Sequence, residues 1–185
     1  MRAQEEGKLS LCWFYLSTAW TMSQTLGLHR ESFLKHDPPA LADTKRRIFW
    51  LLYSMDKNLS LSLGRTSNFH EDDIDCSVFE LSADSGQRVW DLYNHEFIKL
   101  AALQGRTYDG LYSARAHRQS PEQRDRIVEE LAAELLDLRS QLQSVRSTSN
   151  TPLPTSDLIF TNSYVLTRPP RSPPQAPTTK TSWPV

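Results

Sequence analysis

Four long segments repeat apolar residues at every third or fourth position, and this period constrains the fold more than any other feature of the sequence. The segments run from 9 to 28, from 43 to 63, from 82 or 84 to 103 or 112, and from 121 to 146. Such spacing places apolar side chains along one face of an α-helix. No two segments show the alternation of a strand pair. The sequence therefore predicts an all-α fold, an irregular helical bundle.

The first two segments are the richest in large apolar residues. The stripe expected in 9–28 consists of Leu9, Cys12, Trp13, Leu16, Ala19, Trp20 and Leu26. The stripe expected in 43–63, with Asp43 or Thr44 as N-cap, consists of Ile48, Leu51, Leu52, Met55 and Leu59, widened by Phe49, Trp50 and Tyr53. We expect little of this second helix to face water.

Residues with special backbone or capping chemistry mark the ends of these segments. Gly27 and Gly64 can end the first two helices, because glycine adopts left-handed dihedral angles without strain. The last segment begins with Ser120, Pro121 and Gln123, which supply an N-cap, a proline at the first helical position and a capping-box partner. A loop is expected around 37–39 and another over 68–80.

Proline divides the chain into an ordered part and a tail. Eight of its 11 prolines lie beyond Ser147, and a proline inside a helix breaks the backbone ladder. We therefore divide the chain into a polar N-terminal segment 1–8, a helical domain 9–146, and a Pro/Ser/Thr-rich tail 147–185 that is predicted to be disordered.

Charge and cysteine content argue against several classes of protein. The net charge is -1, and the chain therefore lacks the basic excess that is typical of proteins that bind nucleic acid directly. Cys12 and Cys76 are too few and too far apart for a disulfide framework or a structural zinc site, and we expect both thiols to be buried or half-buried. No apolar run reaches the length of a membrane span, and the polar N-terminus is no signal peptide. We expect an intracellular, soluble protein without a cofactor of its own.

Two strings of residues carry more specific information. The first is Leu26, Gly27, Leu28, His29 and Arg30, preceded by Trp13. The second is Arg46, Arg47, Phe49, Trp50, Tyr53 and Asp56, followed by Gly64 and Arg65 and then by Asp72, Asp73 and Asp75. In this order and at this separation they resemble the regulatory, or middle homology, domain of fungal zinc-cluster transcription factors. The resemblance is strongest over residues 9–75.

The resemblance implies control of transcription in the nucleus. In such factors a separate module with six cysteines binds zinc and reads DNA, and this chain does not contain it. Where the family usually has proline after the Gly-Arg pair, this chain has Thr66. The resemblance further implies that the chain begins within the domain and lacks later helices, so that the bundle is incomplete. Partners would be other protein segments or a full-length factor, and a small-molecule effector stays open.

The charged motif residues allow a functional and a structural interpretation. Arg46, Arg47 and Arg65 can form a basic face for an acidic partner. More simply, they pair with Asp56 or with the acidic loop and fix its geometry, which stabilises only where the pairs are partly buried. The carboxylates of that loop can bind a divalent cation, although a solvated or arginine-paired loop is favoured.

Histidine and aromatic residues leave similar choices. His29 can titrate near neutral pH as a switch, but a histidine contacting the carbonyls at a helix end is the simpler interpretation. Trp13, Trp20, Phe49, Trp50 and Tyr53 can line an effector pocket, although such residues more often form core.

Three functions follow in order of preference. The first is the regulatory domain of a transcription factor. The second is a stand-alone helical interaction module without DNA binding. The third is a small helical enzyme, which would require an acid–base pair or a metal site that the sequence does not display.

Overall fold

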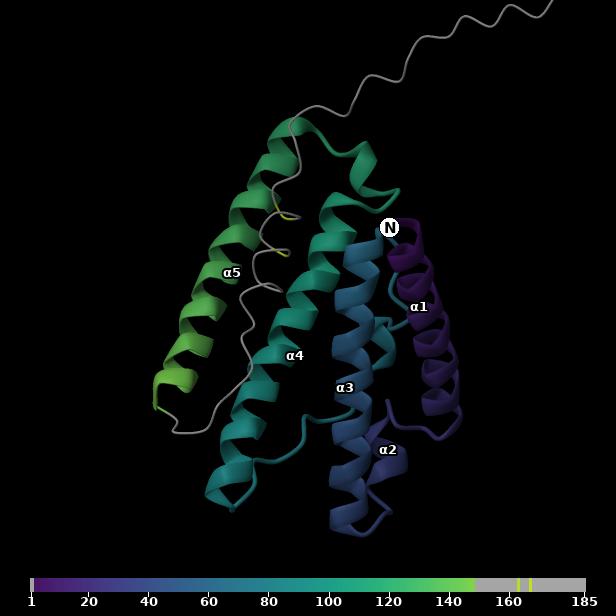
Figure 1. Cartoon of the computed structure of the whole chain (residues 1–185), viewed down its shortest axis with the longest axis vertical. Coiled ribbons are helices and arrows are strands. Elements are labelled where there is room, and N and C mark those ends of the chain that lie inside the picture. Colours follow the sequence, from purple (N-terminus) through teal and green to yellow (C-terminus); the bar gives the residue numbers. More distant parts are fainter. Residues whose placement is uncertain (1, 149–162, 164–166, 168–185) are drawn as a thin grey trace, which may run out of the picture.

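The computed structural model describes residues 2–148, Ser163 and Thr167, and it is helical with no strand among them (Figure 1). The helices are α1 (Arg2–Thr25), α2 (Glu31–Leu34), α3 (Pro39–Leu63), α4 (Ser85–Leu111) and α5 (Pro121–Thr148), with short 3-10 turns at Glu71–Asp73 and Ala116–Arg118. The all-α prediction is confirmed. The predicted disordered tail, 147–185, lies outside the described residues apart from the end of α5 and two isolated positions.

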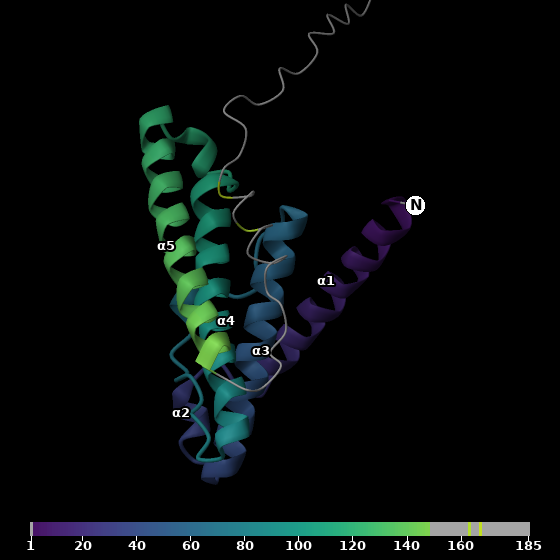
Figure 2. The same cartoon turned by 60° about the vertical axis from the view of Figure 1, so that its left-hand side comes forward.

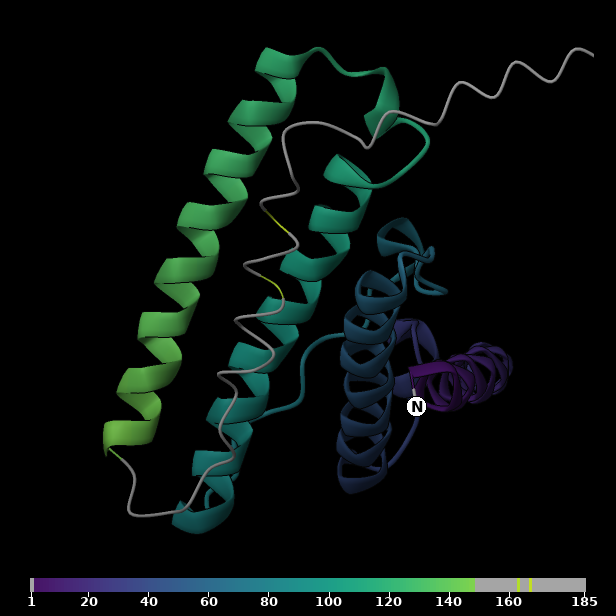
Figure 3. The ribbon, with the colours of Figure 1, turned by 45° about the horizontal axis from the view of Figure 1, so that its top comes forward.

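The long helices follow one another side by side. α3 packs on α4 and α4 packs on α5, and α1 covers another side of α3 (Figures 1 and 3). α1 approaches α3 near its own C-terminal end and projects away from the body toward its N-terminus (Figure 2). None of the helices within the described residues is long and apolar enough to cross a membrane.

The helix ends largely follow the chemistry expected from the sequence. Gly27 and Gly64 have φ of 68° and 62°, and each ends its helix with the two backbone hydrogen bonds of a Schellman motif. The N–H of Gln123 donates to Ser120 Oγ, and the N–H of Ser120 donates to Gln123 Oε1, which completes the predicted capping box. α3 begins earlier than predicted, because Pro39 rather than Asp43 opens its first turn.

Two apolar clusters hold the helices together. The first lies between α4 and α5 and contains Tyr93, Leu100, Leu103, Leu111, Leu131, Leu135, Leu138 and Leu142. The second joins α1, α3, α4 and the α3–α4 loop and contains Trp20, Leu28, Leu34, Phe49, Tyr53, Phe69, Cys76 and Ala101. The α3–α4 loop therefore forms part of the core.

Two predictions about buried faces are wrong. Ile48, Leu51 and Met55 of α3 are about half exposed, as are Leu9 and Leu26 at the two ends of the first predicted stripe. α3 has apolar residues on both sides, and its neighbours cover the side that carries Phe49 and Tyr53 rather than the predicted one. Cys76 is buried as expected, whereas Cys12 is exposed.

Candidate functional site

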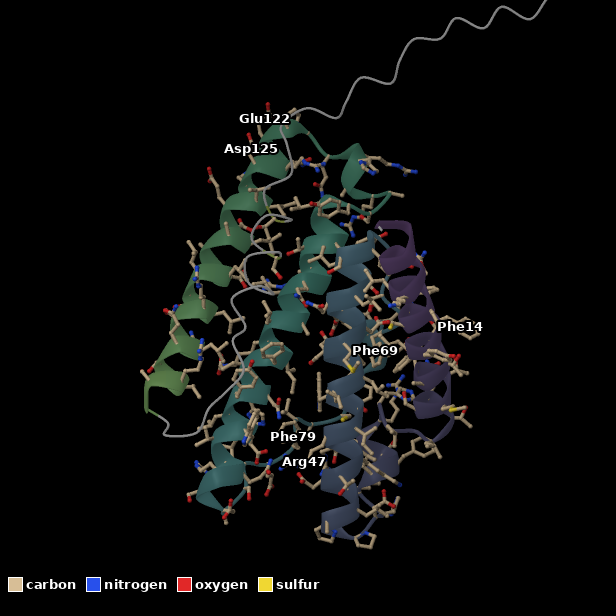
Figure 4. The ribbon with its side chains drawn as sticks, viewed as in Figure 1. Phe14, Arg47, Phe69, Phe79, Glu122 and Asp125 are labelled. Carbon is tan, nitrogen blue, oxygen red and sulfur yellow. The ribbon has the colours of Figure 1, made fainter. Side chains whose placement is uncertain are left out.

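The two motif strings meet around a single aromatic residue, Phe69. Its ring centroid lies 4.1 Å from that of Trp20, 5.7 Å from Phe49 and 5.6 Å from Tyr53 (Figure 4). α1 supplies Trp20, α3 supplies Phe49 and Tyr53, and the α3–α4 loop supplies Phe69. Sequence reasoning missed Phe69, although it is the only apolar side chain between Leu63 and Ile74.

The backbone after α1 pairs with the acidic end of the loop. The N–H groups of Asp75 and Cys76 both donate to the carbonyl of His29, over 3.1 and 3.2 Å. In return, Asp75 Oδ1 accepts from the N–H of Glu31 at 2.8 Å. Two main-chain hydrogen bonds and the Asp75 carboxylate thereby join residues 44 to 47 positions apart.

Glu31 completes the same junction on the side of α3. Its carboxylate pairs with Arg46 and accepts from the N–H of Ser77 at 3.0 Å. The hydrogen bond from Arg46 holds the pKa of Glu31 below its usual value. Arg30 lies 3.6 Å from Asp73 in a more exposed pair. No feature of the sequence pattern indicates Glu31 as the partner of Arg46.

Arg47 joins α3 to α4 through a buried carboxylate. Its Nη1 and Nη2 donate to the two oxygens of Asp91 at 2.5 and 3.1 Å, and its guanidinium lies 4.3 Å from the centroid of the Phe79 ring (Figure 4). Asp91 is 0% exposed and also accepts from Gln87 Nε2 and the N–H of Ser82. Burial alone would raise the pKa of Asp91, but these hydrogen bonds outweigh it and lower the pKa to about 2.

The arginine partners expected from the sequence are therefore wrong, although Arg46 and Arg47 do form ion pairs. Asp56, fully buried, accepts from Ser67 Oγ at 2.7 Å and from the Asn68 side chain at 2.6 Å, and so holds the turn after α3. Arg65 donates to Ser10 Oγ at 3.1 Å and lies 5.0 Å from the centroid of the Trp13 ring.

His29 also differs from the expected arrangement. Its ring packs edge-on against Trp20, with 5.8 Å between centroids, and its Nδ1 is buried without a hydrogen-bond partner among the described residues. The helix-end contact to carbonyls is thus wrong for its side chain. Burial, reinforced by the neighbouring charge of Arg30, lowers the pKa of His29.

A cavity of about 260 Å³ opens between the end of α3, the loop and α4. Lys57 lies beneath it, buried, with its Nζ 2.8 Å from both the Phe69 carbonyl and Glu71 Oε1. The hydroxyl of Tyr53 donates to the same Glu71 oxygen at 2.7 Å. The remaining lining is Ser60, Leu61, Thr66, Ser67, His70, Asp72, Gly105, Tyr108 and Asp109, so the cavity presents polar groups beside apolar surface.

The aromatic motif residues differ in their burial. Trp20, Phe49 and Tyr53 are buried and fill the space between α1 and α3, and none of the five aromatic candidates lines the cavity. Trp13 is half-buried, and Trp50 Nε1 donates to the Ser77 carbonyl at 3.0 Å. Within the part of the chain that the structure describes, no three histidine, cysteine, aspartate or glutamate side chains are grouped to hold a metal ion.

These contacts tie together residues of both motif strings. The family model of the fungal specific transcription factor domain matches residues 2–147. The chain belongs to this family. The match covers every helix of the structure, so the family resemblance extends beyond residues 9–75, where the sequence motifs are strongest.

Three relatives of this chain are named as transcriptional regulators. An uncharacterised transcriptional regulatory protein of Schizosaccharomyces pombe is 35% identical over 114 residues, which are 60% of this chain and 18% of the relative. An ABC-transporter-regulating transcription factor of Aspergillus fumigatus is 25% identical over 138 residues, 70% of this chain and 15% of the relative. A putative transcriptional regulatory protein of Saccharomyces cerevisiae is 29% identical over 138 residues, 68% and 18% respectively.

The chain therefore spans less than a fifth of the length of these three relatives. No solved structure matches it.

Proposed function

We propose that this chain is the helical regulatory part of a nuclear transcription factor and that it acts through protein contacts rather than by binding DNA directly. Membership of the family supports the regulatory role. The observation that carries the second half is that all four motif arginines contact groups of this same chain. Arg30 pairs with Asp73, and the other three bridge elements distant in sequence.

An arginine that binds a phosphate must present its guanidinium to the outside. Arg46 instead reaches from α3 to the segment after α1, and Arg47 reaches from α3 to a buried carboxylate of α4. Arg65 reaches back to α1. Freeing Arg47 for a phosphate would leave the Asp91 charge buried with fewer partners, which is strongly unfavourable. The motif arginines therefore hold elements of the fold together rather than form a DNA-binding surface.

Zinc and DNA reading would belong to a separate module, as in zinc-cluster factors, because this chain has only two cysteines. We also propose that the chain is not an enzyme, since its relatives are regulators and the carboxylates around the cavity are interspersed with hydroxyls and a paired lysine. A small effector acting on this domain would find space in that cavity, whose lining offers both polar groups and apolar surface.

A reporter assay tests the regulatory role. The full chain is fused to a heterologous DNA-binding module and placed upstream of a reporter gene in a fungal host. We expect reporter output to differ from that of the module alone, and a Phe49→Ala fusion, which removes a fully buried ring, to lose the difference. A Glu134→Gln fusion alters an exposed ion pair and should retain it. Equal output from the fusion and the module, at equal protein level, would refute the proposal.

The stand-alone interaction module remains the second candidate, favoured by the large apolar side chains that α1 exposes. The same host separates the two. A stand-alone module would change the output of a full-length family factor when it is expressed untethered, whereas a regulatory segment would act only when joined to the DNA-binding module.

A further inference from the structure

α1 carries a second apolar surface that faces away from the rest of the molecule. We call it the outer face, formed by Leu11, Phe14, Tyr15, Met22, Leu26 and, from α2, Phe33, which are between 51% and 63% exposed. Phe14 points outward in Figure 4. Leu16, Trp20 and Ser23 lie on the opposite, buried side of the same helix. α1 is thus apolar on both sides, as in a helix that lies between two partners.

Phe33 belongs to this surface because of Gly27. A Cβ built on Gly27 would lie 2.5 Å from Phe33 Cγ, so the ring rests directly on the turn that ends α1. Leu26 still continues the helical register, since its N–H donates to the carbonyl of Met22 at 3.0 Å. The outer face therefore extends without a break from α1 to α2.

The outer face carries no charge. From Leu9 to Leu28 the sequence has no aspartate, glutamate, lysine, arginine or histidine. An exposed helix face normally carries such residues, and a continuous apolar patch marks an interaction surface. The threonine hydroxyls on this side are already satisfied: Thr18 donates to the Phe14 carbonyl, Thr21 to Ser17 and Thr25 to Thr21. Covering this face would therefore leave none of these threonine hydroxyls without a partner.

The area matches that needed for a stable pair. Aromatic side chains bury about 150–250 Å² each, and if the leucines and the methionine are given a similar area, the six residues at their observed exposure offer roughly 700 Å². A standard protein–protein interface covers about 800 Å² on each partner.

We propose that the outer face of α1 binds the outer face of a second copy of this chain. A two-fold axis brings the same patch of the two copies together. On a charged patch this would place like charges opposite each other, so an uncharged face is better suited to such a contact. If the axis passes between Thr18 and Ala19, the two α1 helices run antiparallel. Tyr15 then meets Met22 of the partner subunit, and Leu11 meets Leu26 of the partner subunit. The projection of α1 from the body leaves room for this approach (Figure 2).

Sedimentation velocity of the full chain in reducing buffer tests the proposal. We expect twice the monomer mass of 21.2 kDa at micromolar concentration. Met22→Glu should give a monomer with unchanged helicity and melting temperature, because the new charge is exposed in the monomer and buried in the dimer. Leu136→Glu, at a similarly exposed position on α5, is the matched control and should remain dimeric.

The double variant Tyr15→Lys with Met22→Glu tests the register. In the antiparallel pair each new lysine faces a new glutamate, so the dimer should return. A wild-type monomer throughout the micromolar range, or a Met22→Glu variant that stays dimeric, would overturn the proposal. A double variant that stays monomeric would overturn the antiparallel register.

Discussion

Replacing Asp91 by asparagine tests the junction between α3 and α4. The change keeps the shape of the side chain but turns one acceptor oxygen into an NH₂ group that faces donors from Arg47, Gln87 and the Ser82 backbone. The lowering of the pKa of Asp91 from 3.8 to about 2 corresponds to about 2.5 kcal/mol of stability at neutral pH, since each unit of pKa difference is worth about 1.4 kcal/mol. Arg47 keeps its contact with Asp43, which limits the loss.

We therefore expect Asp91→Asn to lower the free energy of unfolding by about 2–3 kcal/mol and the melting temperature by roughly 5–10 °C. Urea unfolding followed by tryptophan fluorescence at pH 7 measures it. The matched control, Glu134→Gln, breaks an exposed pair with Arg106 and should change stability by less than ~0.5 kcal/mol.

The same carboxylate has a pH signature. Because its pKa is lower in the folded protein, its contribution is fully present above pH 3.8 and is lost as the pH falls toward 2. Equal stability of Asp91→Asn and wild type at pH 7 would refute the reasoning that this pair holds α3 to α4.

Three further outcomes follow from the structure. Gly27→Ala should cost about 1–3 kcal/mol more than Gly64→Ala in urea unfolding, because the cost of positive φ is common to both and only the methyl at Gly27 overpacks against Phe33; equal losses would contradict the contact. Phe49→Ala should cost about 3–5 kcal/mol, because the ring is fully buried, and an unchanged unfolding midpoint would rule that out. The folded pKa of His29 lies below 6.5, so wild-type stability is present above pH 6.5 and falls as the pH drops below it. His29→Gln should flatten melting temperature against pH between about 7 and 5, and a slope identical to wild type would exclude His29 as its source.

Helix ends were predictable because their chemistry is local. Ser120 and Gln123 lie three residues apart, and their reciprocal hydrogen bonds need no other part of the chain. Gly27 and Gly64 likewise end helices through bonds to carbonyls of the preceding turn. α3 begins at Pro39 rather than at the predicted Asp43, because a proline fits the first turn of a helix as well as it fits a loop.

The buried face of α3 was not predictable from its own residues. Ile48 and Met55 on one side are as apolar as Phe49 and Tyr53 on the other, so periodicity cannot choose between them. The choice is made by α1 and by Phe69 of the loop, which are distant in sequence.

The family motif contains two arginines that join distant elements but not the carboxylates that pair with them. The motif contains Arg46 and Arg47, and their carboxylate partners Glu31 and Asp91 lie outside it. Asp91 is 44 residues from Arg47 and is an ordinary charged position in a helical pattern. Ion pairs that join distant elements depend on the packing of those elements, which the sequence spacing does not contain.

The central proposal is that the four motif arginines serve the fold rather than a DNA-binding surface. Fluorescence anisotropy of a labelled DNA duplex, titrated with the full chain at low salt, tests it directly. The account predicts no saturable binding up to about 20 µM, a range in which non-specific DNA-binding proteins bind readily. Salt-dependent binding that weakens in Arg46→Gln, at an unchanged melting temperature, would contradict it.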